Sequence, residues 1–304
     1  MIKLYSGEAR PAGKALSVTN LGCRAAFNWD FPAKLEAAYA QGVDVWPLAQ
    51  NVSGSVERFL EWRRTHPVSH VMLENEPFTQ KRMGPVATAD WMRSVPDTPG
   101  ARRVLGGFLI TYPETYQDIR GKVQLFVSAA YGLRPDDVMA FHPYLPSAPS
   151  LDEVPVVAAW FAAQIGAIDS DWPLYAITEW GVPNGRVSYS GRDVPALSEY
   201  MWRGWDAMLK FGCYASAWFM AGPNAQFSEY CDSILCRSDG SPKPLGEVYR
   251  DLPGAMEPPT PEEPSAPEEP SAPEEPEARW VTHNVATWKW DGRLYEATVR
   301  SRAE

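Results

Sequence analysis

The sequence predicts an α/β protein: a (β/α)8 TIM barrel, followed by a disordered Pro/Glu-rich linker and a short β-hairpin tail. Eight short apolar runs alternate with amphipathic helical patterns over about 250 residues, the size of such a barrel. The runs are predominantly apolar, as in parallel strands that are buried on both faces. A doubly wound open sheet is the alternative, but no GxGxxG motif or P-loop follows any run.

The expected elements follow in chain order. The strands are residues 2–6, 23–29, 43–48, 70–76, 103–112, 137–144, 174–180 and 214–220. The clearest helical patterns are residues 32–42, 55–67, 152–166 and 196–212, where apolar residues recur at three- and four-residue spacing. The first helix has to be the short segment 12–22, with Gly22 as its C-cap.

The chain is expected to form a barrel over residues 1–253, a linker over 254–278 and a tail over 279–304. The linker repeats the motif PEEPSA, so it cannot bury enough apolar area to fold and should form a stiff polyproline II spacer. The tail is predicted to be a hairpin about Asp291 and Gly292. So short a sheet rarely folds alone. We therefore expect the tail to dock on a protein partner or to self-associate, and a carbohydrate-binding element is the alternative.

Composition narrows the class of protein. The net charge is -10, which disfavours binding to nucleic acid, although the eight Glu of residues 257–277 account for -8 of it. No stretch approaches the roughly 18 to 20 apolar residues of a membrane span, and residues 1–14 lack the apolar run of a signal peptide. We expect a protein without a signal peptide that is cytoplasmic, or is released by lysis or carried on a particle such as a virion.

The cysteines and histidines predict no metal site. There is no CxxC pair among the four cysteines, and the four histidines show no metal-ligand spacing. Cys231 and Cys236 are close enough in sequence to form a disulfide in an oxidising environment, and two free thiols are the alternative.

Polar residues end several of the apolar runs, and in a barrel the carboxyl ends of the strands build the active site. The predicted site residues from these ends are Asn75, Glu76, His142, Tyr144, Glu179, Trp180 and Trp218. Pro77 and Pro143 disfavour the α region at the residue before each of them, so Glu76 and His142 are expected on extended backbone.

Two carboxylates on different strands of one barrel mouth are what glycoside hydrolysis needs. One protonates the leaving oxygen and the other attacks the anomeric carbon. Asn75 could hydrogen-bond a sugar hydroxyl, and Trp180 or Trp218 could form an apolar floor beneath the ring. His142 or Tyr144 could donate a hydrogen bond to Glu179 and keep it ionised.

These segments resemble a known family. The motifs ENEPF, FHPY, ITEWG and SAWF occur in the order found in the retaining β-glycosidase (β/α)8 barrels, which include cellulases, β-mannanases and β-xylosidases. The resemblance covers residues 20–252. It implies Glu76 as acid/base, Glu179 as nucleophile, Asn75 on the 2-hydroxyl and Trp218 as platform. His142 and Tyr144 would line the site, and no metal or organic cofactor is implied.

The sequence also departs from this pattern. Glu74 stands where an aromatic residue is frequent, and Arg24 is the candidate for an arginine expected on an early strand. Because Glu74 shares the strand parity of Glu76, it could point inward and would then need a partner such as Arg24. Trp46, Gln50 and Asn51 end the third strand and Trp29 ends the second, so each could line a sugar subsite.

Two other functions remain open from the sequence. A non-catalytic barrel could bind glycans or serve as a structural part of a larger assembly, such as a virion, tethered through the tail. A barrel enzyme of phosphate or aldol chemistry is disfavoured, since the sequence shows no phosphate loop and no obvious strand-end lysine for a Schiff base.

Overall fold

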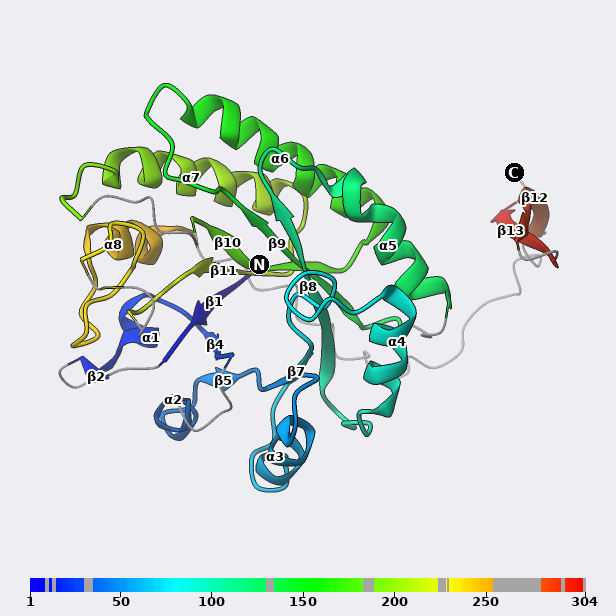
Figure 1. The fold of residues 1–304 in the computed structure, drawn as a ribbon, viewed down its shortest axis with the longest axis horizontal. Coiled ribbons are helices and arrows are strands. Elements are labelled where there is room, and N and C mark those ends of the chain that lie inside the picture. The colour runs from blue at the N-terminus through cyan, green and yellow to red at the C-terminus, as the bar shows by residue number, and fades with distance from the viewer. Residues whose placement is uncertain are drawn as a thin grey trace, which may run out of the picture. The chain divides into compact units, whose positions relative to one another are not determined.

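The computed structural model describes residues 1–8, 11–12, 15–29, 35–129, 134–182, 189–223, 228, 230–253, 280–290 and 293–302. The chain divides into two compact units, Met1–Met256 and Glu257–Glu304. The first unit is built around a curled parallel sheet with helices on its outer face (Figure 1).

The sheet confirms the predicted barrel. Its strands are β1 (Ile2–Ser6), β4 (Ala25–Phe27), β5 (Asp44–Val45), β6 (Leu48–Ala49), β7 (His70–Leu73), β8 (Arg102–Thr111), β9 (Val138–Tyr144), β10 (Tyr175–Gly181) and β11 (Ala215–Phe219). Each pairs in parallel with its neighbours, and β1 pairs with both β4 and β11.

The third barrel strand is split into β5 and β6. Pro47 stands between them and has no N–H to donate to the ladder. Trp46 N donates to Ala26 O at 2.9 Å, and Met72 N donates to Pro47 O at 2.8 Å. The two halves therefore pair with opposite neighbours, and the continuous chain between them closes the barrel at eight strands.

Helices cover the outside of the strands (Figure 1). They are α1 (Ser17–Asn20), α2 (Glu36–Ala40), α3 (Ser55–Arg63), α4 (Pro85–Ser94), α5 (Tyr116–Ala129), α6 (Val154–Asp171), α7 (Val194–Lys210) and α8 (Pro244–Asp251). The predicted helical patterns are all present. The expected helix over 12–22 is mostly wrong, because β2 (Pro11–Ala12) and β3 (Ala15–Leu16) pair as a short antiparallel ladder before α1. Gly22, at a φ of 65°, follows the end of α1.

The apolar core lies in two layers. Inside the barrel, small side chains such as Ala140, Ala176 and Ala215 pack in one cluster with larger ones such as Trp46 and Met72. The second layer packs between the strands and the helices. Because successive residues on a strand point to opposite faces, each strand contributes to both layers. Cys23, Cys213, Cys231 and Cys236 are buried free thiols, so the two cysteines of residues 231–236 do not form a disulfide.

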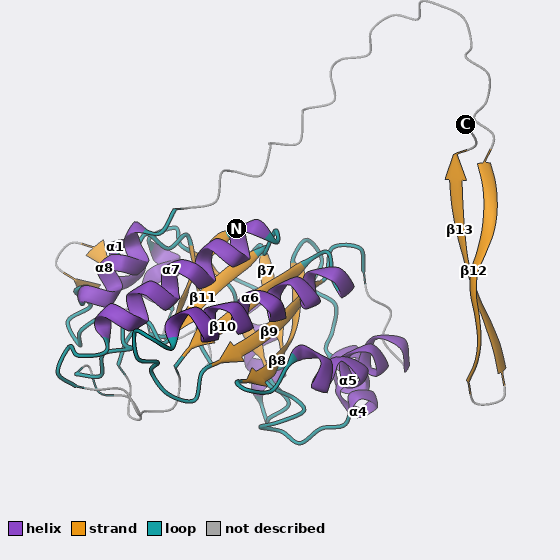
Figure 2. Cartoon of the chain, turned by 90° about the horizontal axis from the view of Figure 1, so that it is seen from above, coloured by secondary structure: helices purple, strands orange, loops and turns teal. Residues whose placement is uncertain are grey.

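The second unit contains the predicted hairpin. Strand β12 (Trp280–Trp290) pairs antiparallel with β13 (Arg293–Arg302), and Trp290 pairs with Arg293 across the two-residue connection (Figure 2). The predicted linker, residues 254–278, lies outside the described residues. Among the described residues, no helix is both long enough and apolar enough to cross a membrane.

Candidate active site

Glu76 and Glu179 meet at the carboxyl ends of the barrel strands. Glu179 lies on β10, and Glu76 lies three residues beyond the end of β7. Both are buried: Glu76 is 5% exposed and Glu179 is 3% exposed. One carboxylate oxygen of each residue and a ring nitrogen of His142 lie within 4.8 Å of one another.

The backbone at Glu76 is not extended, contrary to the expectation from Pro77. Its φ is 48°, in the left-handed region, and Glu74 has a φ of 67°. Proline disfavours the right-handed α region at the preceding residue, and Glu76 avoids that region by adopting a positive φ. Glu76 N donates to Gly106 O at 3.0 Å, and this hydrogen bond holds Glu76 against β8. His142, on β9, has the predicted extended backbone.

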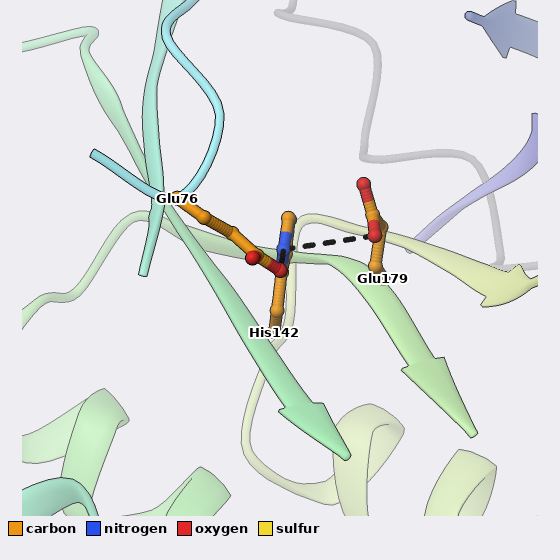
Figure 3. Close-up of side chains that lie close together, drawn as sticks. All are labelled: Glu76, His142 and Glu179. Carbon is orange, nitrogen blue, oxygen red and sulfur yellow. Dashed lines mark hydrogen bonds and ion pairs between the residues drawn. The ribbon is translucent and has the colours of Figure 1, made fainter. Parts of the chain in front are cut away.

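His142 lies between the two carboxylates (Figure 3). Its Nδ1 is 3.0 Å from Glu76 Oε1 and 3.7 Å from Glu179 Oε2. Its Nε2 is 2.9 Å from the hydroxyl of Thr178. The imidazole is fully buried. A protonated imidazole would therefore have an oxygen partner at each ring nitrogen and would face negative charge on one side.

Each oxygen of Glu179 has its own hydrogen-bond donor. The hydroxyl of Tyr144 donates to Oε2, and the indole Nε1 of Trp29 donates to Oε1 at 2.5 Å. Gln50 Nε2 donates to the carbonyl of Trp29 at 2.9 Å and so holds that residue in place. The sequence placed Trp29 at a strand end but not as a donor to Glu179, because a donor 150 residues away carries no local signal.

Burial and charge set the ionisation of the site. Burial raises the pKa of Glu179, and the charge of His142 and the donors Tyr144 and Trp29 offset this only in part. Burial acts to lower the pKa of His142, but Glu179 and the hydrogen bond to Glu76 outweigh it, so this pKa is raised. Burial, with the nearby carboxylates, raises the pKa of Tyr144 well above its usual value. Tyr144 therefore stays a hydrogen-bond donor.

Gly107 makes room for the imidazole. A Cβ on this residue would lie 2.7 Å from ring atoms of His142 and 3.5 Å from Asn75 Oδ1. The φ of Gly107 is 66°, and the pairing of β8 with β9 shifts register beside it. A side chain here would displace His142. Asn75 is buried, and its carboxamide lies at this same point of the site.

Trp180 and Trp218 do not line the site, contrary to the expectation from their strand positions. Trp180 is fully buried and packs on Phe161 of α6 and Tyr200 of α7, because it follows Glu179 and so points to the opposite face of β10. Trp218 is 1% exposed and donates to Ser233 O at 2.9 Å.

Phe219 is the aromatic residue of β11 that reaches the site, and sequence reasoning missed it. Its ring contacts Trp29 at 5.2 Å and Tyr144 at 5.7 Å between centroids. Both of those residues hydrogen-bond Glu179. The alternation of side chains along β11 places Phe219 where Trp218 was expected, one residue further along the strand.

Arg24 and Trp46 are also placed elsewhere. Arg24 is exposed and precedes β4, so it lies at the amino ends of the strands, opposite the site. Trp46 is fully buried, bonds Asp44 through Nε1 at 2.8 Å and stacks on His70 at 4.1 Å. Trp46 therefore fills the amino end of the barrel interior and does not form a sugar subsite.

Glu74 is buried as expected, but Arg24 is not its partner. Its Oε2 accepts from Asn51 N at 2.8 Å and its Oε1 accepts from Asn75 N at 3.0 Å. Burial raises the pKa of Glu74, and these backbone donors act in the opposite direction. Two backbone N–H groups therefore bond the Glu74 carboxylate, for which the sequence suggested Arg24 as the partner.

Glu76, His142 and Glu179 are the residues of the described part of the chain that could hold a metal ion. The donor set, two carboxylates and an imidazole, suits zinc. A metal would have to displace the proton that the two carboxylates favour on His142, since a ligating imidazole nitrogen must be free of its proton. In the arrangement shown, Nδ1 of His142 lies close to both carboxylates.

Comparison with known proteins supports the fold. No protein-family model matches the sequence, and no curated protein matches it. Among solved structures, an endo-β-1,3-glucanase of glycoside hydrolase family 128 from Lentinula edodes is similar, with a TM-score of 0.56 and 16% identity. The match covers 82% of this chain and 98% of that one.

Two further structures are similar at the same level. A β-1,3-glucanosyltransferase from Rhizomucor miehei matches with a TM-score of 0.54 and 11% identity, over 80% of this chain and 96% of that one. An exo-β-1,4-mannosidase from an Opitutaceae bacterium matches with a TM-score of 0.56 and 14% identity, over 83% of this chain and 59% of that one. Identities this low show a shared (β/α)8 barrel fold, as the sequence predicted.

Proposed function

We propose that this protein is a retaining glycoside hydrolase that cleaves β-linked oligo- or polysaccharides by double displacement with two glutamates. The observation that supports this most is the placement of Glu76 and Glu179 on one barrel mouth, where one carboxylate oxygen of each lies within 4.8 Å of the other. Retaining enzymes hold their carboxyl groups about 5 to 5.5 Å apart, whereas inverting enzymes need roughly 6.5 to 9.5 Å to admit a water. The barrel's similarity to glucanases and a mannosidase favours the same class.

Glu179 has the surroundings of a nucleophile. Trp29 and Tyr144 hold one carboxylate oxygen each, so the side chain is oriented before a substrate arrives. In the first step a Glu179 oxygen bonds to the anomeric carbon while the glycosidic C–O bond breaks. Phe219, between the two donors, offers an apolar surface beside the reacting sugar.

Glu76 supplies and recovers the proton. It gives its proton to the leaving glycosidic oxygen in the first step. In the second step its carboxylate takes a proton from water, the water oxygen bonds to the anomeric carbon, and the bond to Glu179 breaks. With Glu76 protonated, Glu179 ionised and His142 protonated, the buried group of three carries no net charge. Asn75, next to Glu76, is assigned to the 2-hydroxyl of the sugar.

The tail has a separate proposed role. An isolated two-stranded hairpin such as β12–β13 is marginally stable in water at best. Its pairing spans residues 280–302, within the second unit of the chain, Glu257–Glu304. The hairpin is proposed to dock on a protein partner or on a second copy, and to attach the barrel there.

The test is reducing-end release from a panel of β-linked glycans that begins with β-1,3-glucans. Wild type, Glu179→Ala and the control Glu57→Ala are compared, since Glu57 is exposed on α3. We expect wild type and control to cleave one glycan and Glu179→Ala to be inactive. Added azide should restore turnover and give the α-glycosyl azide. A wild type that binds a glycan tightly but cleaves none would instead support a binding or structural barrel.

A further inference from the structure

Glu74 is a buried carboxylate that the proposed reaction does not use. Its side chain is 2% exposed, and within the described part of the chain it forms no ion pair within 4 Å, Lys81 being the cation that attracts it from further away. Burying an ionised carboxylate without a salt bridge is unfavourable unless hydrogen bonds replace its water. The placement of Glu74 therefore needs a local explanation.

The hydrogen bonds of Glu74 join two loops of the barrel mouth. One oxygen accepts from Asn51 N in the loop after β6, and the other accepts from Asn75 N in the loop after β7. Glu74 N donates to Ala49 O at 2.8 Å, and the carboxamide of Asn51 lies 3.3 Å from the sulfur of Met83. The segment from Glu74 to Met83 is thus held against the end of β6.

The same segment carries unusual backbone geometry. Glu74 and Glu76, on either side of Asn75, both have positive φ, at 67° and 48°. Residues other than glycine rarely adopt this backbone region, and they persist in it where the surrounding structure holds them there. Glu74 supplies that hold, because its carboxylate bonds the N–H of the residue between the two. This left-handed backbone directs the Glu76 side chain toward His142, whose Nδ1 lies 3.0 Å from Glu76 Oε1.

We propose that Glu74 is a positioning residue for the acid/base Glu76: by bonding Asn51 N and Asn75 N, it keeps the strained turn that presents the Glu76 carboxyl to the glycosidic oxygen. This role rests on the proposed glycosidase function. It differs from a general stabilising role. The hydrogen-bond partners of Glu74 are backbone N–H groups and not donors to Glu179, so its loss should impair proton donation more than nucleophilic attack by Glu179.

The variant Glu74→Gln tests this with little change in shape. A glutamine has one carbonyl oxygen that accepts hydrogen bonds and an NH2 group that cannot, so one of the two backbone N–H groups loses its partner. The matched control is Asp232→Asn. Asp232 is also buried, at 4% exposure, and its two oxygens accept separately from Gly191 N at 2.9 Å and Asp193 N at 3.2 Å.

The readout is kcat/KM on two substrates of the same sugar: the natural β-linked oligosaccharide and its 2,4-dinitrophenyl β-glycoside. The dinitrophenolate leaves without protonation, whereas a sugar leaving group needs the acid. We expect Glu74→Gln to lose about ten-fold or more on the oligosaccharide, part of the 10² to 10⁴ that general acid catalysis supplies. On the aryl glycoside it should lose about three-fold or less. Asp232→Asn should change both substrates by the same factor.

An equal loss on both substrates by Glu74→Gln, or no loss on either, overturns the inference. Crystal structures of wild type and Glu74→Gln add a readout that needs no activity. We expect the contact between Glu76 and His142 to be lost in the variant, and its retention counts against the role. If wild type cleaves neither substrate, the proposed function fails, and the crystal structures alone decide whether Glu74 positions Glu76.

Discussion

The indole Nε1 of Trp29 donates a 2.5 Å hydrogen bond to Oε1 of Glu179, across 150 residues of sequence. Trp29 follows β4 and Glu179 lies on β10, and the curvature of the barrel brings these two strand ends together. Because Tyr144 occupies the other oxygen, Glu179 is held at both ends of its carboxylate. The orientation of the proposed nucleophile is therefore decided by one residue that follows β4 and another on β9.

Trp29→Phe removes this hydrogen bond and keeps an aromatic ring against Phe27 and Phe219. A hydrogen bond to a charged group contributes about 1.5 to 3 kcal/mol. We expect kcat/KM to fall about ten- to hundred-fold with the fold intact, measured by steady-state kinetics and thermal unfolding. The control is Trp172→Phe, which loses an indole hydrogen bond from the end of α6 to Tyr116 on α5. Equal activity in wild type and Trp29→Phe contradicts this role.

The stability of the protein should depend on the protonation of His142. Burial lowers the pKa of this residue, but Glu179 and Glu76 outweigh burial and raise it above 6.5. A group whose pKa is raised by folding contributes stability that is fully present below its unfolded pKa and is lost as pH rises through its folded pKa.

The comparison is between wild type and His142→Gln, by urea unfolding from about pH 6 to about pH 9. The advantage of wild type in the free energy of unfolding should shrink as pH rises above 6.5. An advantage that grows with pH over this range would show that folding lowers the pKa of His142.

Trp180 should behave as a core residue. It is fully buried among Phe161, Tyr200 and Trp218. Trp180→Ala should lower the free energy of unfolding by about 3 to 5 kcal/mol, as for other large aromatic deletions. The KM of the folded fraction should stay unchanged. A raised KM with little loss of stability would instead place Trp180 in a sugar subsite.

Removing residues 257–304 should leave the barrel folded and active, because Met1–Met256 form a compact unit by themselves. Circular dichroism, thermal unfolding and kcat/KM of the shortened chain are the measurements. Light scattering of the full and shortened chains tests self-association of the tail. Failure of residues 1–256 to fold would show that the hairpin is part of the barrel.

Much of the fold could be predicted because it follows from local patterns. Strands buried on both faces read as continuous apolar runs, and amphipathic spacing marks the helices between them. Segment 12–22 was harder, because a four-residue helix after a short hairpin leaves almost no periodic pattern. The third strand is split at Pro47. The proline can be read from the sequence, but the split cannot, because it depends on the strand having a neighbour on each side.

The sequence by itself determined the eight strands and which polar residues end them, since both depend on residue type and spacing along the chain. Glu76, His142, Tyr144 and Glu179 were found this way, and the structure brings them together. Only the tertiary structure decided which aromatic side chains face the site. One residue along a strand changes the face, so Phe219 enters the site while Trp180 and Trp218 pack away from it.

The tertiary structure also decided the partners of buried charge. Glu74 bonds two backbone N–H groups, and Trp29 bonds Glu179. Neither pairing is encoded by spacing, because each depends on how strand ends converge at the barrel mouth.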